Sequence, residues 1–247
     1  MKLSRISLLH CWRLAYRSVL FLGALVLYVV NRVQHRAEPF SGLDHNRLFL
    51  LLIGLLFSVE MLMRFFPSRN ESMGCQKQFA CNYRPTGRQA GREVNRGVWT
   101  VALSWIGLNG AIAAAHYLGW IDNSILYLIA LAYSVCDMIC ILFFCPFQTW
   151  MMKNKCCGSC RIYNWDYAMM FTPLAFAKSV VGWVLLLFAL ALLLRWEIEA
   201  HLYPERFSEA SNASLACANC QEKLCSHKKQ LQAFLKARQQ ELRDRFG

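Results

Sequence analysis

The stretch VWTVALSWIGLNGAIAAAHYLGWIDNSILYLIALAYSVCDMICILFFCPFQTW, residues 98–150, decides the fold class of this chain. Two apolar runs, 98–121 and 125–150, flank the short polar turn Asp122-Asn123-Ser124. Each run exceeds the ~20 residues that a helix needs to cross the ~30 Å hydrocarbon core of a bilayer. Water is absent from that core, so a crossing segment must satisfy its own backbone hydrogen bonds as a helix. The stretch therefore predicts a transmembrane helical hairpin.

Three further apolar segments, at about 14–30, 48–66 and 173–196, have similar lengths. The first is followed by Asn31, Arg32 and Val33 instead of a small-residue cleavage pattern, which favours a retained signal anchor over a signal peptide. The sequence predicts an all-α, polytopic membrane protein with about five transmembrane helices. Its expected organisation is a bundle over residues 1–196, with cysteine-rich juxtamembrane loops, and a soluble tail over residues 197–247.

The distribution of basic residues predicts the orientation of the bundle. Lys and Arg number 27 against 15 Asp and Glu, and they flank the apolar runs, so they indicate cytoplasmic loops at anionic lipid and argue against nucleic acid as a partner. The loop over residues 68–97 is rich in Arg, and the turn at 122–124 carries no basic residue. The N-terminus is therefore predicted to be cytoplasmic. Five crossings place the tail outside, unless the apolar stretch 162–178 also enters the membrane.

A small polar group is predicted inside the hairpin. Asn109 and Asp137 fall at similar depth if the turn is centred near Asn123. Tyr133, Cys136 and Cys140 share or adjoin the helical face of Asp137. A carboxylate in the bilayer is normally partnered or functional. Two interpretations stay open: a proton or cofactor site formed by these five residues, or a protonated Asp137 hydrogen-bonded to Asn109 that joins two helices.

Two other patterns predict packing and no chemistry. Glu60 and Arg64 have the i, i+4 spacing of an ion pair whose side chains reach toward the membrane surface. Small residues recur every four positions in the third segment, which lets a neighbouring helix approach closely: Gly107, Ala111, Ala115 and Gly119.

Cysteines cluster in the loops next to the membrane segments. Cys75 and Cys81 lie in the first basic loop, and a second group surrounds the Cys157-Gly158-Ser159-Cys160 motif. A gap of two residues lets two thiolates chelate one metal ion. We expect an iron–sulfur cluster or zinc here, with ligands drawn from Cys81, Cys145, Cys156, Cys157 and Cys160. The alternatives are a redox dithiol at the same motif, and structural or lipidated cysteines.

The tail holds a second candidate metal set. Cys217, Cys220, Cys225 and His227 could complete a tetrahedral zinc site. The following stretch, 221–246, has the charge and thin apolar stripe of a helix that could pair with a protein partner. Asn212-Ala213-Ser214 matches a glycosylation sequon, a pattern that is common by chance.

Three functions are compatible with these features. The first is a membrane redox or electron-transfer component with a cysteine-ligated metal. The second is a non-enzymatic scaffold, assembly factor or complex subunit with structural zinc. The third, least favoured because the spans hold few central polar groups, is a metal or small-solute transporter. The sequence contains no P-loop, GxGxxG, HExxH or GxSxG motif that would identify a common enzyme class.

Overall fold

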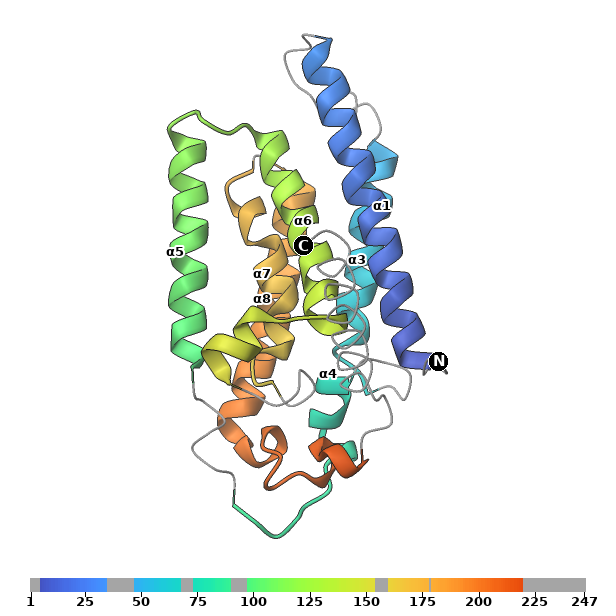
Figure 1. Ribbon diagram of the computed structural model, residues 1–247, viewed down its shortest axis with the longest axis vertical. Helices are drawn as coiled ribbons and strands as arrows, with labels where there is room; N and C mark the ends of the chain where they lie inside the picture. Colours follow the sequence, from blue (N-terminus) through green and yellow to red (C-terminus); the bar gives the residue numbers. More distant parts are fainter. Residues whose placement is uncertain are drawn as a thin grey trace, which may run out of the picture.

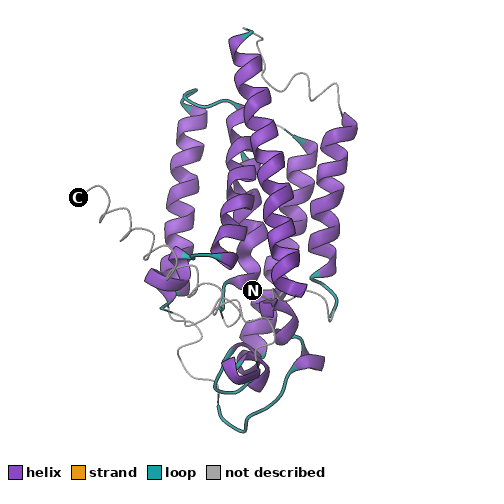
Figure 2. Ribbon diagram, turned by 45° about the vertical axis from the view of Figure 1, so that its right-hand side comes forward, coloured by secondary structure: helices purple, strands orange, loops and turns teal. Residues whose placement is uncertain are grey.

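The computed structural model describes residues 5–34, 47–67, 73–89, 97–153, 160–177 and 179–219. Apart from an isolated β-bridge between Pro85 and Asn212, every regular element in these ranges is helical, which confirms the predicted all-α class (Figure 2). Four helices are long and apolar enough to cross a membrane: Ser7–Val33, Val98–Tyr117, Asn123–Leu142 and Val180–Leu202.

The long helices stand side by side along the long axis of the molecule (Figures 1 and 2). They are α1 (Arg5–Val33), α3 (Arg47–Met63), α5 (Val98–Tyr117), α6 (Asn123–Leu142) and α8 (Val180–Leu202). The main pairings are α1 with α6 and α3 with α8. Large apolar side chains on their outer faces are exposed, such as Leu22 at 56% and Ile106 at 66%. Lipid is the solvent that suits such faces.

Local sequence sets several helix ends. The side chain of Asp122 accepts a hydrogen bond from the Ile125 backbone N–H at 2.9 Å and caps the start of α6. α6 ends at Leu142, whereas the predicted segment ran to residue 150. Pro146 lacks the N–H that a continuing helix requires, and a separate π-helical turn, η3 (Phe147–Met152), follows it. In the same way, α8 starts at Val180 after the cap of Ser179, later than the predicted start at residue 173.

Residues 160–177 form a broken segment that runs alongside the long helices. It consists of η5 (Tyr163–Trp165), α7 (Asp166–Phe171) and η6 (Thr172–Ala175). Its first part lies beside the end of α8, where the Arg161 guanidinium donates two hydrogen bonds of 2.7 Å to the Glu197 carboxylate. Its last part lies beside the start of α8, where Leu174 packs against Gly182. The broken segment therefore runs antiparallel to α8 along most of the bundle (Figure 1).

The broken segment also lies between α5 and α6. η6 contacts both helices, and the Trp105 indole N–H donates to the Thr172 hydroxyl at 3.3 Å. Most of the segment's large side chains are buried, including Tyr167 at 0% and Met170 at 1% exposure. Irregular backbone is tolerated at membrane depth only where protein covers it. The surrounding helices give this segment that cover.

Three parts of the chain pack on one another at the end of the bundle where α3 and α6 end (Figure 1). We call them the cap, and they are residues 73–89, 160–165 and 203–219. They contain α4 (Met73–Gln78), η1 (Ala80–Asn82), η5 and three 3₁₀ turns, η7 (Pro204–Phe207), η8 (Ala213–Leu215) and η9 (Cys217–Asn219). Asn164 donates to the Gln78 side chain at 2.8 Å, and the Ala213 N–H donates to the Arg84 carbonyl at 2.8 Å.

Asn212 is the central residue of the cap. Its side chain is fully buried; its amide donates to the Lys77 carbonyl at 3.1 Å and to the Arg206 carbonyl at 2.9 Å, and its oxygen accepts from the Ser214 N–H at 3.0 Å. The sequon at this position therefore presents no accessible amide for a glycan in the folded chain.

Candidate functional site

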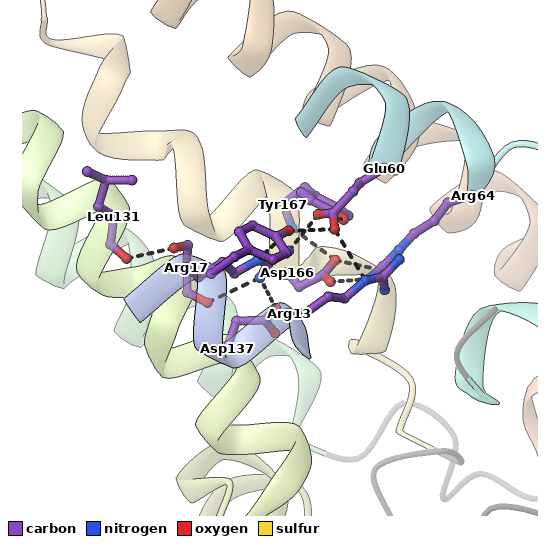
Figure 3. Close-up of polar contacts among 10 residues, drawn as sticks. Arg13, Arg17, Glu60, Arg64, Leu131, Asp137, Asp166 and Tyr167 are labelled. Carbon is purple, nitrogen blue, oxygen red and sulfur yellow. Dashed lines mark hydrogen bonds and ion pairs between the residues drawn. The ribbon is translucent and has the colours of Figure 1, made fainter. Parts of the chain in front are cut away.

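A buried network of opposite charges connects α1, α3, α6 and α7 (Figure 3). We call it the charge network; it consists of three cations and three anions, Arg13, Arg17, Arg64, Glu60, Asp137 and Asp166. Each of the arginines is at most 6% exposed. The formal charges balance, which is the condition under which ionised groups are tolerated away from water.

Arg17 is the centre of the charge network. Its guanidinium donates to Glu60 at 2.8 Å, to Asp137 at 3.1 Å and to the Ser134 carbonyl at 3.1 Å. It also stacks over the Phe57 ring at 5.4 Å. One side chain of α1 thus bridges α3 and α6, because the planar fork of a guanidinium can bind two carboxylates at once.

Tyrosines complete the coordination of Glu60. The hydroxyls of Tyr16 and Tyr167 donate to its carboxylate at 2.6 and 3.0 Å, and Arg13 pairs with it at 3.2 Å. On the neighbouring turn, Arg64 binds Asp166 through two contacts of 2.9 and 2.6 Å. Glu60 and Arg64 are both buried, so the expectation that they reach toward the membrane surface is wrong. Glu60 accepts from residues of α1 and α7, and Arg64 binds a carboxylate of α7.

The predicted polar group of the hairpin is not assembled as expected. Asp137 binds Arg17, while the Asn109 amide donates to the Trp105 carbonyl of its own helix at 3.0 Å. The hydrogen bond expected between Asn109 and Asp137 is not formed. Tyr133 packs its ring on Trp105 at 4.9 Å between centroids. Cys136 is exposed, and Cys140 is partly buried one turn beyond it.

The position of the turn between α5 and α6 explains why Asn109 and Asp137 do not meet. α5 ends at Tyr117 and α6 begins at Asn123, so the turn is centred near residue 120. The prediction placed it near Asn123, which shifts the register of the two helices. With the observed turn, Asn109 lies roughly 10 Å along α6 from the level of Asp137, at ~1.5 Å per residue.

The cysteines of the loop group are only partly described. Cys81 is exposed in η1, Cys145 is partly buried after α6, and Cys160 is buried at the start of the broken segment. Cys156 and Cys157 lie outside the described residues. Within the described ranges, no three His, Cys, Asp or Glu side chains are arranged to hold a metal ion.

The tail group is described at its first member alone. Cys217 begins η9, which packs on η8 in the cap. Cys220, Cys225, His227 and the expected partner-binding helix lie outside the described residues. The cap nevertheless brings the backbone of three cysteine-bearing segments to one end of the bundle. Sequence spacing did not predict that Cys81 and Cys217 belong to parts of the chain that dock on each other.

Sequence reasoning also missed the arginines of the charge network. Arg13 and Arg17 are among the basic residues next to apolar runs, which the sequence assigns to loops at anionic lipid. A usable signal was present, because Arg13 and Arg17 are four residues apart and extend into an apolar run, while Asp137 lacks a cationic partner nearby in sequence.

Comparison of the chain with protein-family models, with curated proteins and with solved structures found no match. The fold and the two clusters, the charge network and the cap, are therefore the observations on which a functional conclusion depends.

Proposed function

We propose that this chain is a membrane redox or electron-transfer component that holds a cysteine-ligated metal in its cap. The observation that carries the proposal is the docking of residues 73–89, 160–165 and 203–219 on one another. Each of these parts contains or borders a cysteine motif. Thiolates that converge from separate segments are the usual ligands of iron–sulfur clusters and structural zinc.

The proposed ligands come from two groups. Cys81, Cys156, Cys157 and Cys160 belong to the loops, and Cys217, Cys220, Cys225 and His227 belong to the tail. We leave Cys145 out of this set because its thiol is hydrogen-bonded to Cys140 at the end of α6. A bound cluster would supply one-electron chemistry next to the membrane, and the cap residues would hold and shield it.

The topology that we propose has six crossings. α1, α3, α5, α6 and α8 each pass through the bilayer, and the broken segment makes the remaining crossing between α6 and α8. This arrangement places the N-terminus, the basic loop over 68–97 and the tail on the same side. Since that loop and the region after α6 are rich in Lys and Arg, the positive-inside rule assigns this side to the cytoplasm. Reduced cysteines are normal in that compartment.

Metal analysis of the purified protein tests the proposal. We expect stoichiometric iron with visible absorbance after anaerobic purification in detergent. A Cys157→Ser/Cys160→Ser double variant should lose the metal, while the matched control Cys11→Ser, altered at an exposed cysteine of α1, should retain it. Full metal content in the double variant would show that Cys157 and Cys160 are not ligands. Purified protein that contains neither iron nor zinc would contradict the proposal.

A scaffold or complex subunit with structural zinc is the second candidate. The charge network favours it, because its carboxylates are all engaged by arginines or tyrosines and it joins four elements as a structural tie would. Colourless protein with tightly bound zinc, unchanged by a reductant, would select this candidate over the redox component.

A further inference from the structure

Two thiols meet where α6 ends. The thiol of Cys140, in the last turn of the helix, is hydrogen-bonded to Cys145 beyond it. Residues five positions apart on a regular helix point in different directions. Here the final turn is widened, since the Phe144 N–H donates to the Ile139 carbonyl at 3.2 Å, and Pro146 then redirects the chain. The two sulfurs are brought together by the way in which this helix terminates.

Cys145 is the better nucleophile of the two by geometry. Its sulfur accepts the Gln148 backbone N–H at 3.4 Å. Hydrogen bonds donated to a sulfur stabilise its thiolate form, and the thiolate is the species that attacks a disulfide. The Cys145 carbonyl accepts from the backbone and hydroxyl of Thr149 at 3.0 and 2.9 Å, which fixes the turn that presents the thiol.

The pair is accessible and lies at a definite place in the molecule. Cys140 and Cys145 are each partly exposed. α6 ends at the same end of the bundle as the cap (Figure 1). An external disulfide can therefore approach the pair from the membrane surface on that side.

We propose that Cys140 and Cys145 form a dithiol site that reduces an external disulfide. The Cys145 thiolate attacks one sulfur of that disulfide, forms a mixed disulfide and expels the first thiolate. The Cys140 sulfur then attacks Cys145, closes an intramolecular disulfide and expels the second thiolate. The two protons of the dithiol pass to the two departing thiolates, and two electrons move from the chain to the external disulfide, so the exchange is balanced.

Trapping of the mixed disulfide tests this site. The purified full-length protein is incubated with glutathione disulfide, quenched with acid, alkylated and mapped by mass spectrometry. Wild type should yield a Cys140–Cys145 disulfide. Cys140→Ser lacks the resolving thiol and should accumulate glutathione on Cys145, about tenfold above wild type. Cys145→Ser should carry no comparable adduct on Cys140.

Cys136→Ser is the matched control, because Cys136 lies one turn from Cys140 on the same helix and is exposed. It should form the Cys140–Cys145 disulfide as wild type does. Failure of Cys140→Ser to accumulate the adduct, or equal adduct on Cys136, would overturn the proposal. Metal content separates it from the proposed metal site: unchanged metal in Cys145→Ser is expected, and loss of metal would make Cys145 a ligand and refute the dithiol.

Discussion

At the scale of single residues, Arg17 joins three helices of the bundle through its guanidinium. It is 1% exposed and contacts carboxylates on two other helices. Removing one member of a buried ion pair leaves a charge without its partner, which costs more than the pair itself contributes. The ion pairs of Arg17 therefore join α1 to α3 and α6.

Arg17→Met should lower the free energy of unfolding by about 3–5 kcal/mol. The reason is that Asp137 loses the arginine that pairs with it, and Glu60 keeps Arg13 but loses Arg17. SDS titration of the purified protein in mixed micelles measures this change. Arg32→Met, at the exposed end of the same helix, should stay within about 0.5 kcal/mol of wild type. Equal effects of the two substitutions would mean that the charge network adds no stability.

At the scale of secondary-structure elements, α5 is attached chiefly through its ends and through η6. Gly97 precedes the helix with φ +73°, and a Cβ there would lie 2.5 Å from the Met151 carbonyl oxygen of η3. The small-residue stripe that predicted a helix–helix interface has open space at Gly107 in the described chain. The close backbone approach at Gly97 is thus one of the contacts that position α5.

Gly97→Ala should destabilise the protein by about 1–3 kcal/mol, since it adds backbone strain and a clash at the same position. Gly107→Ala, on the same helix, should change stability by less than about 1 kcal/mol, because its Cβ meets nothing. The same SDS titration compares the two variants. A larger loss for Gly107→Ala would show that the stripe is covered by a partner helix in the micelle.

At the scale of the whole molecule, the number of crossings that we propose depends on the direction of the broken segment. It runs from the end of α8 at Glu197 to the start of α8 at Gly182. With the crossing that we propose for it, the start of α1 and the end of α8 lie on one side of the membrane, and residues 203–219 dock on residues 73–89 there.

Epitope tags test this topology. Tags at the N- and C-termini should share one accessibility to protease in sealed membrane vesicles, and a tag inserted after Gly119 should show the opposite one. All three should be cleaved once detergent opens the vesicles. A C-terminal tag with the same protease accessibility as the Gly119 tag would contradict six crossings and support five crossings with an external tail.

Apolar length is a local property, so the sequence by itself determined the all-α class and the approximate positions of the four helices that are long enough to cross a membrane. It also indicated that Asp137 needed a partner. Only the tertiary structure decided that this partner is Arg17, since the two lie 120 positions apart and Asn109 was displaced by the length of the turn. The crossing that we propose for residues 160–177 also depends on tertiary structure, because irregular backbone becomes acceptable at membrane depth only when α5, α6 and α8 cover it. The cap also depends on tertiary structure, because the hydrogen bonds of Asn212 join segments that are far apart in the sequence and share no local pattern.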